Sequence, residues 1–195
     1  MKFIAIKVSL TLLAASAFCF AQQSVGAGGK WIRTTEVDKA GKTTVSFVLP
    51  ADTIDPDRHP AISISCTGHS KPPDVIYNAD VLLEPTRRDP MNYYSPALQT
   101  AVKVDDQKIY KPVWDVILSG TNQKRAIVDR KTLHHLLTGS SMRVRISDHN
   151  DESHLDEFTI GGLNVNELRD DCGSKWFGKE EASSSKGSAD EKKMK

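Results

Sequence analysis

The sequence predicts a mainly β protein, an antiparallel β-sandwich or curled barrel with two short helices and one disulfide. Three observations support this fold class. Apolar and polar residues alternate in many short segments between Lys30 and Gly173, which is the period of a β-strand. Turn-forming residues separate nearly all of these segments, as in a sandwich or barrel. Only two cysteines remain once an N-terminal export signal is removed.

The strand predictions rest on which residues share a face. In residues 142–147, two arginines alternate with three apolar residues, so one face is polar and the other apolar. Residues 111–120 are apolar on both faces, which favours a strand in the centre of a sheet. The predicted strands cover residues 30–37, 43–50, 61–66, 101–106, 111–120, 142–147 and 155–162.

Two short helices interrupt the strands. In residues 129–139, three leucines at helical spacing follow Asp129, which is the expected N-cap. In residues 163–173, the expected N-cap is Asn164, and a glutamate follows three positions later, as in a capping box. Cys172 then lies at the end of the second helix, just before a charged tail.

The N-terminus has the three parts of a secretory signal, which are a basic start, an apolar middle and a small-residue exit. The apolar run is too short to cross a bilayer, which takes roughly 20 residues. We therefore expect cleavage and a periplasmic or secreted protein. The expected parts are a signal peptide at 1–21, a flexible segment at 22–29, a single β-rich domain at 30–177 and a disordered charged tail at 178–195.

The cysteine count predicts one disulfide. Cys19 leaves with the signal, so Cys66 and Cys172 are the two that remain. Two cysteines in an exported chain most often pair, because the compartment is oxidising. The alternatives are two free thiols or a link between molecules. The pairing would attach the last helix to the strand that ends in Cys66, with the sulfur on the core-facing side.

Composition and charge exclude several classes of function. The formal net charge of +1 becomes −1 when Lys2 and Lys7 leave with the signal, which gives no basic footprint for nucleic acid. No second long apolar segment follows the signal, so we expect no membrane span after cleavage. The roughly 170 residues that remain suit one domain with one core.

The histidines and acidic residues give no strong catalytic or metal motif. His149, Asp151, Glu152 and His154 are residue types that bind metals, yet such a run between two strands is typical of a solvated turn. Neighbouring histidines at 134–135 fall on the first helix, which leaves at least one of them near solvent. We therefore expect no catalytic residues, no metal and no cofactor. An active site assembled from distant residues stays open as an alternative.

Residues 86–96 are the candidate partner-binding surface. Prolines are frequent there and no period runs through the segment, which predicts a loop. Tyrosine, arginine and methionine are enriched at protein interfaces. The residues of these types are Arg87, Arg88, Met91, Tyr93 and Tyr94. The alternative is that the tyrosines fold back and cover an edge of the sandwich.

The succession of motifs resembles the VasI/TagO-type family of small exported proteins associated with bacterial type VI secretion. The motifs are the Trp-led strand at 30–37, a cysteine ending "ISISC", "VKVD", "PVWDVILS", a Leu-rich helix, "MRVRI", "FTIGGL" and a last helix ending in "CG". The resemblance covers roughly residues 30–173. It implies an accessory module that assists a secretion machine.

The sequence thus favours an exported, non-enzymatic binding or accessory module whose partner is a protein or a component of the cell envelope. Two alternatives come from other classes. One is a periplasmic or secreted hydrolase or metal-dependent enzyme, and the other is an exported inhibitor of enzymes, which only fold-level analogy supports.

Overall fold

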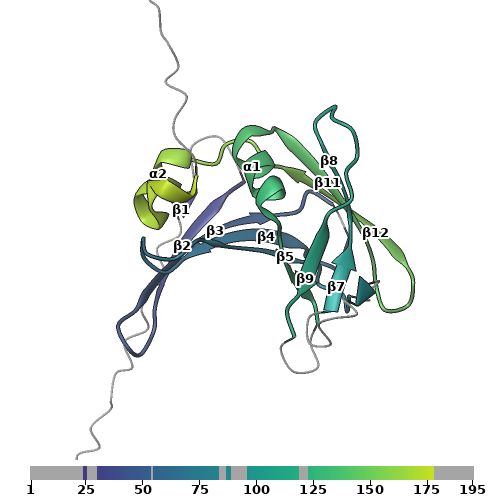
Figure 1. Cartoon of the computed structure of the whole chain (residues 1–195), viewed down its shortest axis with the longest axis horizontal. Coiled ribbons are helices and arrows are strands. Elements are labelled where there is room, and N and C mark those ends of the chain that lie inside the picture. The colour runs from purple at the N-terminus through teal and green to yellow at the C-terminus, as the bar shows by residue number, and fades with distance from the viewer. Residues whose placement is uncertain are drawn as a thin grey trace, which may run out of the picture.

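Two antiparallel β-sheets form the framework of the computed structural model, which describes residues 24–25, 30–53, 55–83, 87–88, 96–118 and 123–177. The predicted signal at 1–21 and the predicted tail at 178–195 lie outside these ranges. Figure 1 shows the smaller sheet and both α-helices on one side of the larger sheet. Within the described ranges the sheets do not close into a barrel, so the prediction of a mainly β, sandwich-like fold with two helices is confirmed.

The larger sheet has nine strands. In spatial order they are β1 (Ser24–Val25), β2 (Ile32–Val37), β3 (Thr43–Pro50), β4 (Ala61–Cys66), β5 (Asp74–Asn78), β10 (Arg125–Ile127), β9 (Val113–Val116), β7 (Pro96–Gln99) and β6 (Arg87–Arg88). The smaller sheet has three strands, β12 (Ser153–Thr159), β11 (Ser141–Ser147) and β8 (Ala101–Val104). The helices are α1 (Arg130–Thr138), α2 (Val165–Cys172) and the short 3-10 helix η1 (Ser174–Trp176).

The core lies between the sheets and is built from the apolar phase of each alternating strand. Phe47 of β3 pairs in register with Ile64 of β4, and both are buried. The ring of Tyr77 on β5 lies 5.5 Å from Trp114 in its own sheet and 6.5 Å from Phe158 of β12 in the other sheet. The alternation in the sequence therefore specified which residues face inward.

Thr100 is the corner at which the chain passes from one sheet to the other. β7 ends at Gln99 in the larger sheet and β8 begins at Ala101 in the smaller one. Thr100 is 2 % exposed, and both its backbone N–H and its hydroxyl donate to the carbonyl of Pro112, over 3.1 and 3.2 Å. The bond from the N–H gives this buried backbone group a partner at a bend, where the regular hydrogen bonds between strands are interrupted.

Both helices begin at the predicted caps. The carboxylate of Asp129 accepts from the N–H of Thr132 at 3.3 Å, and the side chain of Asn164 accepts from the N–H of Glu167 at 3.2 Å. None of the described helices is long and apolar enough to cross a bilayer.

Several local details differ from the sequence predictions. The strand within residues 111–120 lies inside the larger sheet, between β10 and β7, as predicted, but its burial alternates and Val113 is 42 % exposed, so only one face is buried. Within the segment expected to be flexible, at 22–29, Ser24–Val25 pair with β2. Within the expected loop at 86–96, Arg87–Arg88 pair with β7, which starts at Pro96. A strand of two residues has no period to detect, and proline is tolerated at the first position of a strand.

Candidate functional site

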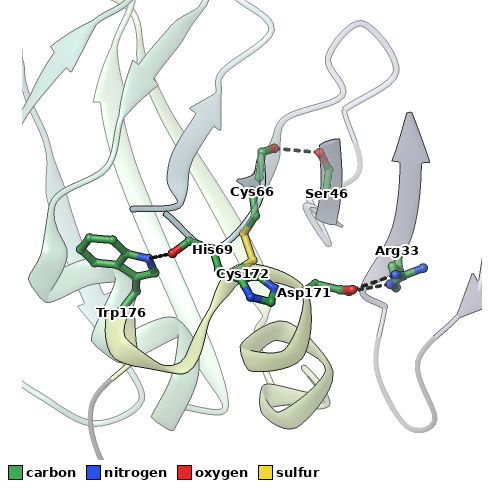
Figure 2. The surroundings of a disulfide bond; sticks show 8 residues. Arg33, Ser46, Cys66, His69, Asp171, Cys172 and Trp176 are labelled. Atoms are coloured by element: carbon green, nitrogen blue, oxygen red, sulfur yellow. Dashed lines mark hydrogen bonds and ion pairs between the residues drawn. A yellow bond between two sulfur atoms is a disulfide. The ribbon is translucent and has the colours of Figure 1, made fainter. Parts of the chain in front are cut away.

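The disulfide joins the last helix to the larger sheet. Cys66 ends β4 and Cys172 ends α2, with their Cα atoms 5.2 Å apart, and both residues are buried. This spacing lies inside the range that a disulfide spans. Figure 2 shows the bond between the sheet and the helix end. The predicted pairing is confirmed, including the inward direction of Cys66.

A second attachment holds α2 from its other side. The guanidinium of Arg33 on β2 donates to both carboxylate oxygens of Asp171, over 2.9 and 3.1 Å (Figure 2). It also lies 3.1 Å from the carboxylate of Glu167. The hydrogen bond to Asp171 raises the pKa of Arg33. A bidentate pair fixes orientation as well as distance, so α2 is held in a defined position on the sheet.

Immediately after the disulfide, the chain turns and places two aromatic residues on the loop that follows β4. Gly173 has φ = 89°, and a Cβ there would lie 3.1 Å from the Cβ of His69, so glycine suits both the backbone and the space. The indole N–H of Trp176 donates to the carbonyl of His69 at 3.3 Å (Figure 2). Phe177 is buried beside it, so η1 is fixed against the body of the protein.

The fixed position of η1 creates an apolar groove between η1, α1 and the start of β5, which we call the η1 groove. Its volume is about 400 Å³, a size within the range of ligand pockets. It opens to solvent, because Ile127 in its lining is 48 % exposed. The lining residues are Pro72, Pro73, Asp74, Val75, Ile127, Val128, Arg130, Leu133, His134, Leu137, Lys175, Trp176 and Phe177.

The sequence reasoning missed the η1 groove, although α1 carried a signal. Its three leucines predicted one core-facing stripe, but only Leu136 is buried, at 1 % exposed. Leu133 and Leu137 are partly buried, pack against the same core and also line the groove. When the apolar face of a helix is wider than its contact with the core, the extra apolar residues indicate a second contact surface.

α1 also holds the buried histidine of the predicted His134–His135 pair. His134 is exposed, as expected for one of the two, whereas His135 is 8 % exposed and packs 5.4 Å from the ring of Tyr110. Its Nε2 is buried and has no hydrogen-bond partner among the described residues. Burial lowers the pKa of His135, and the neighbouring charges of Lys131 and His134 lower it further.

We expect His135 to make stability depend on pH. Its pKa in the folded protein lies below the usual value of 6.5, although Asp129 and Asp105 oppose the shift. Between the two pKa values the unfolded chain binds more protons, so stability is fully present above about pH 6.5 and falls as the pH drops through that window. Urea unfolding at pH 7.5 and pH 5.0 should show a smaller pH-dependent loss for His135→Leu than for wild type.

The matched control for this prediction is His134→Leu on the exposed side of the same helix, which should keep most of the wild-type pH dependence, because it removes only a minor cause of the lowered pKa of His135. Equal pH dependence in wild type and His135→Leu would contradict the role given to His135.

The histidine-rich segment at 149–154 covers most of the hairpin turn between β11 and β12, and its last residue, His154, lies on β12 and is half-buried. His149, Asp151 and Glu152 are exposed, as predicted for a turn. The ligand atoms that do cluster, within 4.8 Å of one another, belong to Asp148, Glu152 and His154. The sequence reasoning missed Asp148, which precedes the run.

Asp148 organises this turn. Its Oδ1 accepts the N–H groups of Asn150 and Glu152 at 2.8 and 2.9 Å, and its Oδ2 lies 3.1 Å from Nε2 of His154. The hydrogen bond with His154 lowers the pKa of Asp148. Both carboxylate oxygens are therefore engaged in stabilising the turn, which accounts for the cluster without a ligand.

A buried charged triad links the two sheets. Asp156 of β12 is 0 % exposed, and both of its oxygens accept from Nη2 of Arg58, at 3.0 and 3.1 Å. The hydroxyl of Tyr77 donates to the same carboxylate. Burial raises the pKa of Tyr77 well above its usual range, and the negative charge of Asp156 adds to the effect, so Tyr77 stays a donor.

The sequence contains an indication of this triad, which is an acidic residue at an inward-facing position of a predicted strand. In residues 155–162, Asp156 falls on the same phase as Phe158 and Ile160, which face the core. An acidic residue on the inward phase of a strand requires a buried partner. Arg58, which supplies it, comes from a loop almost 100 positions earlier, with a sequence separation of 98.

A second cavity, of about 350 Å³, lies beside the smaller sheet. Its lining is mostly polar and includes the exposed ion pair of Arg143 with Glu157, at 2.8 Å. Exposed ion pairs of this kind are common on solvated surfaces. We therefore take the η1 groove as the candidate site.

The predicted partner-binding residues are only partly covered by the structure. Arg87 and Arg88 have a described backbone in β6, whereas Met91, Tyr93 and Tyr94 lie outside the described residues. That surface stays a prediction.

The comparisons with known proteins bear on the fold. No family model and no curated protein matches the sequence. Among solved structures, the chain is similar to invasion associated protein B from Bartonella henselae, with a TM-score of 0.52 and 11 % sequence identity. The match covers 76 % of this chain and 94 % of that protein. At this identity, the likeness establishes a shared fold alone.

Proposed function

We propose that this protein is an exported binding module that holds a protein or envelope component in the η1 groove and performs no chemistry on it. The observation that carries the proposal is an apolar groove, partly open to solvent, whose walls are held in place by a disulfide. Disulfides persist in oxidising compartments, which supports export. Assistance to type VI secretion is the specific form of this role that the sequence resemblance suggests.

The groove suits binding for a physical reason. Apolar side chains in a concave, preformed site bury area on association without first having to be ordered. Cys66–Cys172 and the Arg33–Asp171 pair hold α2, and Trp176 is held by the carbonyl of His69. The hydrolase and inhibitor alternatives have no comparable support, because the Asp148 cluster is accounted for by the turn it stabilises.

Site-specific photo-crosslinking tests this proposal. The photoreactive residue p-benzoylphenylalanine is placed at position 127, in the groove, and at position 155 on β12 as the control. Ile127 and Leu155 have similar exposures, 48 % and 41 %, so both report on accessible apolar surface. Irradiation of envelope extracts should give a discrete cross-linked product from position 127 alone. Products of equal yield from both positions, or from position 155 alone, would overturn the proposal.

A further inference from the structure

We propose that the η1 groove selects an extended peptide segment of a partner protein in which apolar anchors are flanked by acidic side chains. The inference rests on the proposed function and adds the chemistry of the partner. It comes from the contrast between the apolar lining of the groove and the charge of its rim.

The rim is predominantly basic. Arg130 and His134 extend from α1 on one side and Lys175 from η1 on the other, and all three are exposed. One acidic residue, Asp74, lines the groove. The Nζ of Lys175 lies 4.5 Å from the centre of the Trp176 ring, so its charge is held directly beside the apolar lining. Complementary charge at a rim selects between partners more than it adds affinity.

The lining supplies recessed apolar contacts. Leu133, Leu137 and Trp176 are partly buried, and two consecutive prolines, Pro72 and Pro73, form part of the opposite wall. A volume of about 400 Å³ suits a few apolar side chains of a segment rather than a whole helix face. Tryptophan and proline in such a wall are rigid, which lowers the entropy cost of binding.

A peptide fits this arrangement better than a membrane surface does. Membrane-binding surfaces present apolar side chains outward, to reach the acyl chains below the headgroups. Here Leu133, Leu137 and Trp176 are partly buried, although Ile127 is exposed, and exposed Asp74 would face the anionic headgroups.

The tail of this chain is a second conceivable occupant, because it starts at residue 178, directly after Phe177 in the groove lining. Its composition argues against it. Residues 178–195 contain five lysines and four acidic residues and almost no apolar side chain. A segment of that kind matches neither the lining nor the basic rim.

Panning of a phage-displayed library of linear peptides tests the inference. The bait is the mature protein, and the matched bait is the double variant Arg130→Glu and Lys175→Glu, which alters only exposed side chains of the rim. Wild type should enrich peptides with apolar anchors and net negative charge. The double variant should enrich peptides with the same anchors and net positive charge.

Affinity is measured with the best acidic peptide by tryptophan fluorescence. Trp31 and Trp114 are 2 % and 0 % exposed, so a change on binding reports on Trp176, and Trp176→Phe should abolish it. The double charge reversal should weaken this peptide by about tenfold or more. A variant ending at Phe177 should bind the peptide as the full chain does.

Three results would overturn the inference. If panning on the wild type enriches no peptides, or enriches peptides without a net negative charge, an acidic peptide is not the partner. Co-sedimentation of the wild type with vesicles containing phosphatidylglycerol, lost in the charge-reversed variant, makes the partner a membrane. Stronger peptide binding after removal of residues 178–195 makes the tail the occupant. If cross-linking is specific to position 127 but the panned peptides show no charge bias, the proposed function stands and this inference is refuted.

Discussion

Replacing Cys66 and Cys172 together by alanine is expected to lower the free energy of unfolding by about 4 kcal/mol. The bond spans 106 positions, and closing a loop of that length restricts the unfolded chain by roughly this amount. For a domain of this size, the melting temperature should fall by roughly 8–16 °C. Urea unfolding followed by circular dichroism measures the loss.

Ser65→Ala is the control for this prediction, because Ser65 lies next to Cys66 on β4 and its hydroxyl pairs with Ser46 at 2.8 Å on the partly exposed face. It should cost no more than about 1 kcal/mol. A double cysteine variant as stable as Ser65→Ala would show that the packing of α2, and not the covalent bond, holds the C-terminal end of the domain.

Asp156→Ala is expected to cost about 3–5 kcal/mol, because it leaves the guanidinium of Arg58 buried with only the longer ion-pair contact to Asp55, at 3.9 Å. The neighbouring variant Glu157→Ala breaks only the exposed pair with Arg143, whose side chains are 47 % and 58 % exposed, and should cost less than about 1 kcal/mol. The two residues are adjacent on β12, so the comparison isolates burial of the charge. Equal costs for the two variants would refute the role given to the triad.

A triple variant sharpens this test. Arg58→Met, Tyr77→Phe and Asp156→Leu together remove every charge and hydroxyl of the triad while keeping similar volumes. Buried ion pairs are often replaced by apolar groups at little cost, so the triple variant should be more stable than Asp156→Ala. If it is the less stable of the two, the polar contacts themselves stabilise the domain.

The sequence predicted the long strands because their alternation is repeated often enough to be recognised. β11 and β12 have seven residues each and β3 has eight, and all three were found. β10 has three residues, which is too short for a period to stand out, and β7 does not alternate apolar and polar residues. The disulfide was predictable for a different reason, since two cysteines allow one intramolecular pairing.

The η1 groove was beyond prediction because its walls come from residues 72–75, 127–137 and 175–177. Nothing local shows that these segments meet. Leucine, tryptophan and proline are also the types that a core uses, so they do not mark a binding surface by themselves. Leu133 and Leu137 also pack against the core that buries Leu136, and only the three-dimensional structure shows that they line a groove as well.

The separation of the two cysteines also sets an order of events during maturation. The chain is made from its N-terminus, so Cys66 is available 106 positions before Cys172 and must wait as a free thiol. In the finished fold both cysteines are buried, at 3 % and 0 % exposed, so an oxidant has to reach them before α2 settles against the sheet. Bond formation is therefore tied to the last docking step of the domain. For the same reason, a reductant reaches the finished bond only when the C-terminal end of the domain opens.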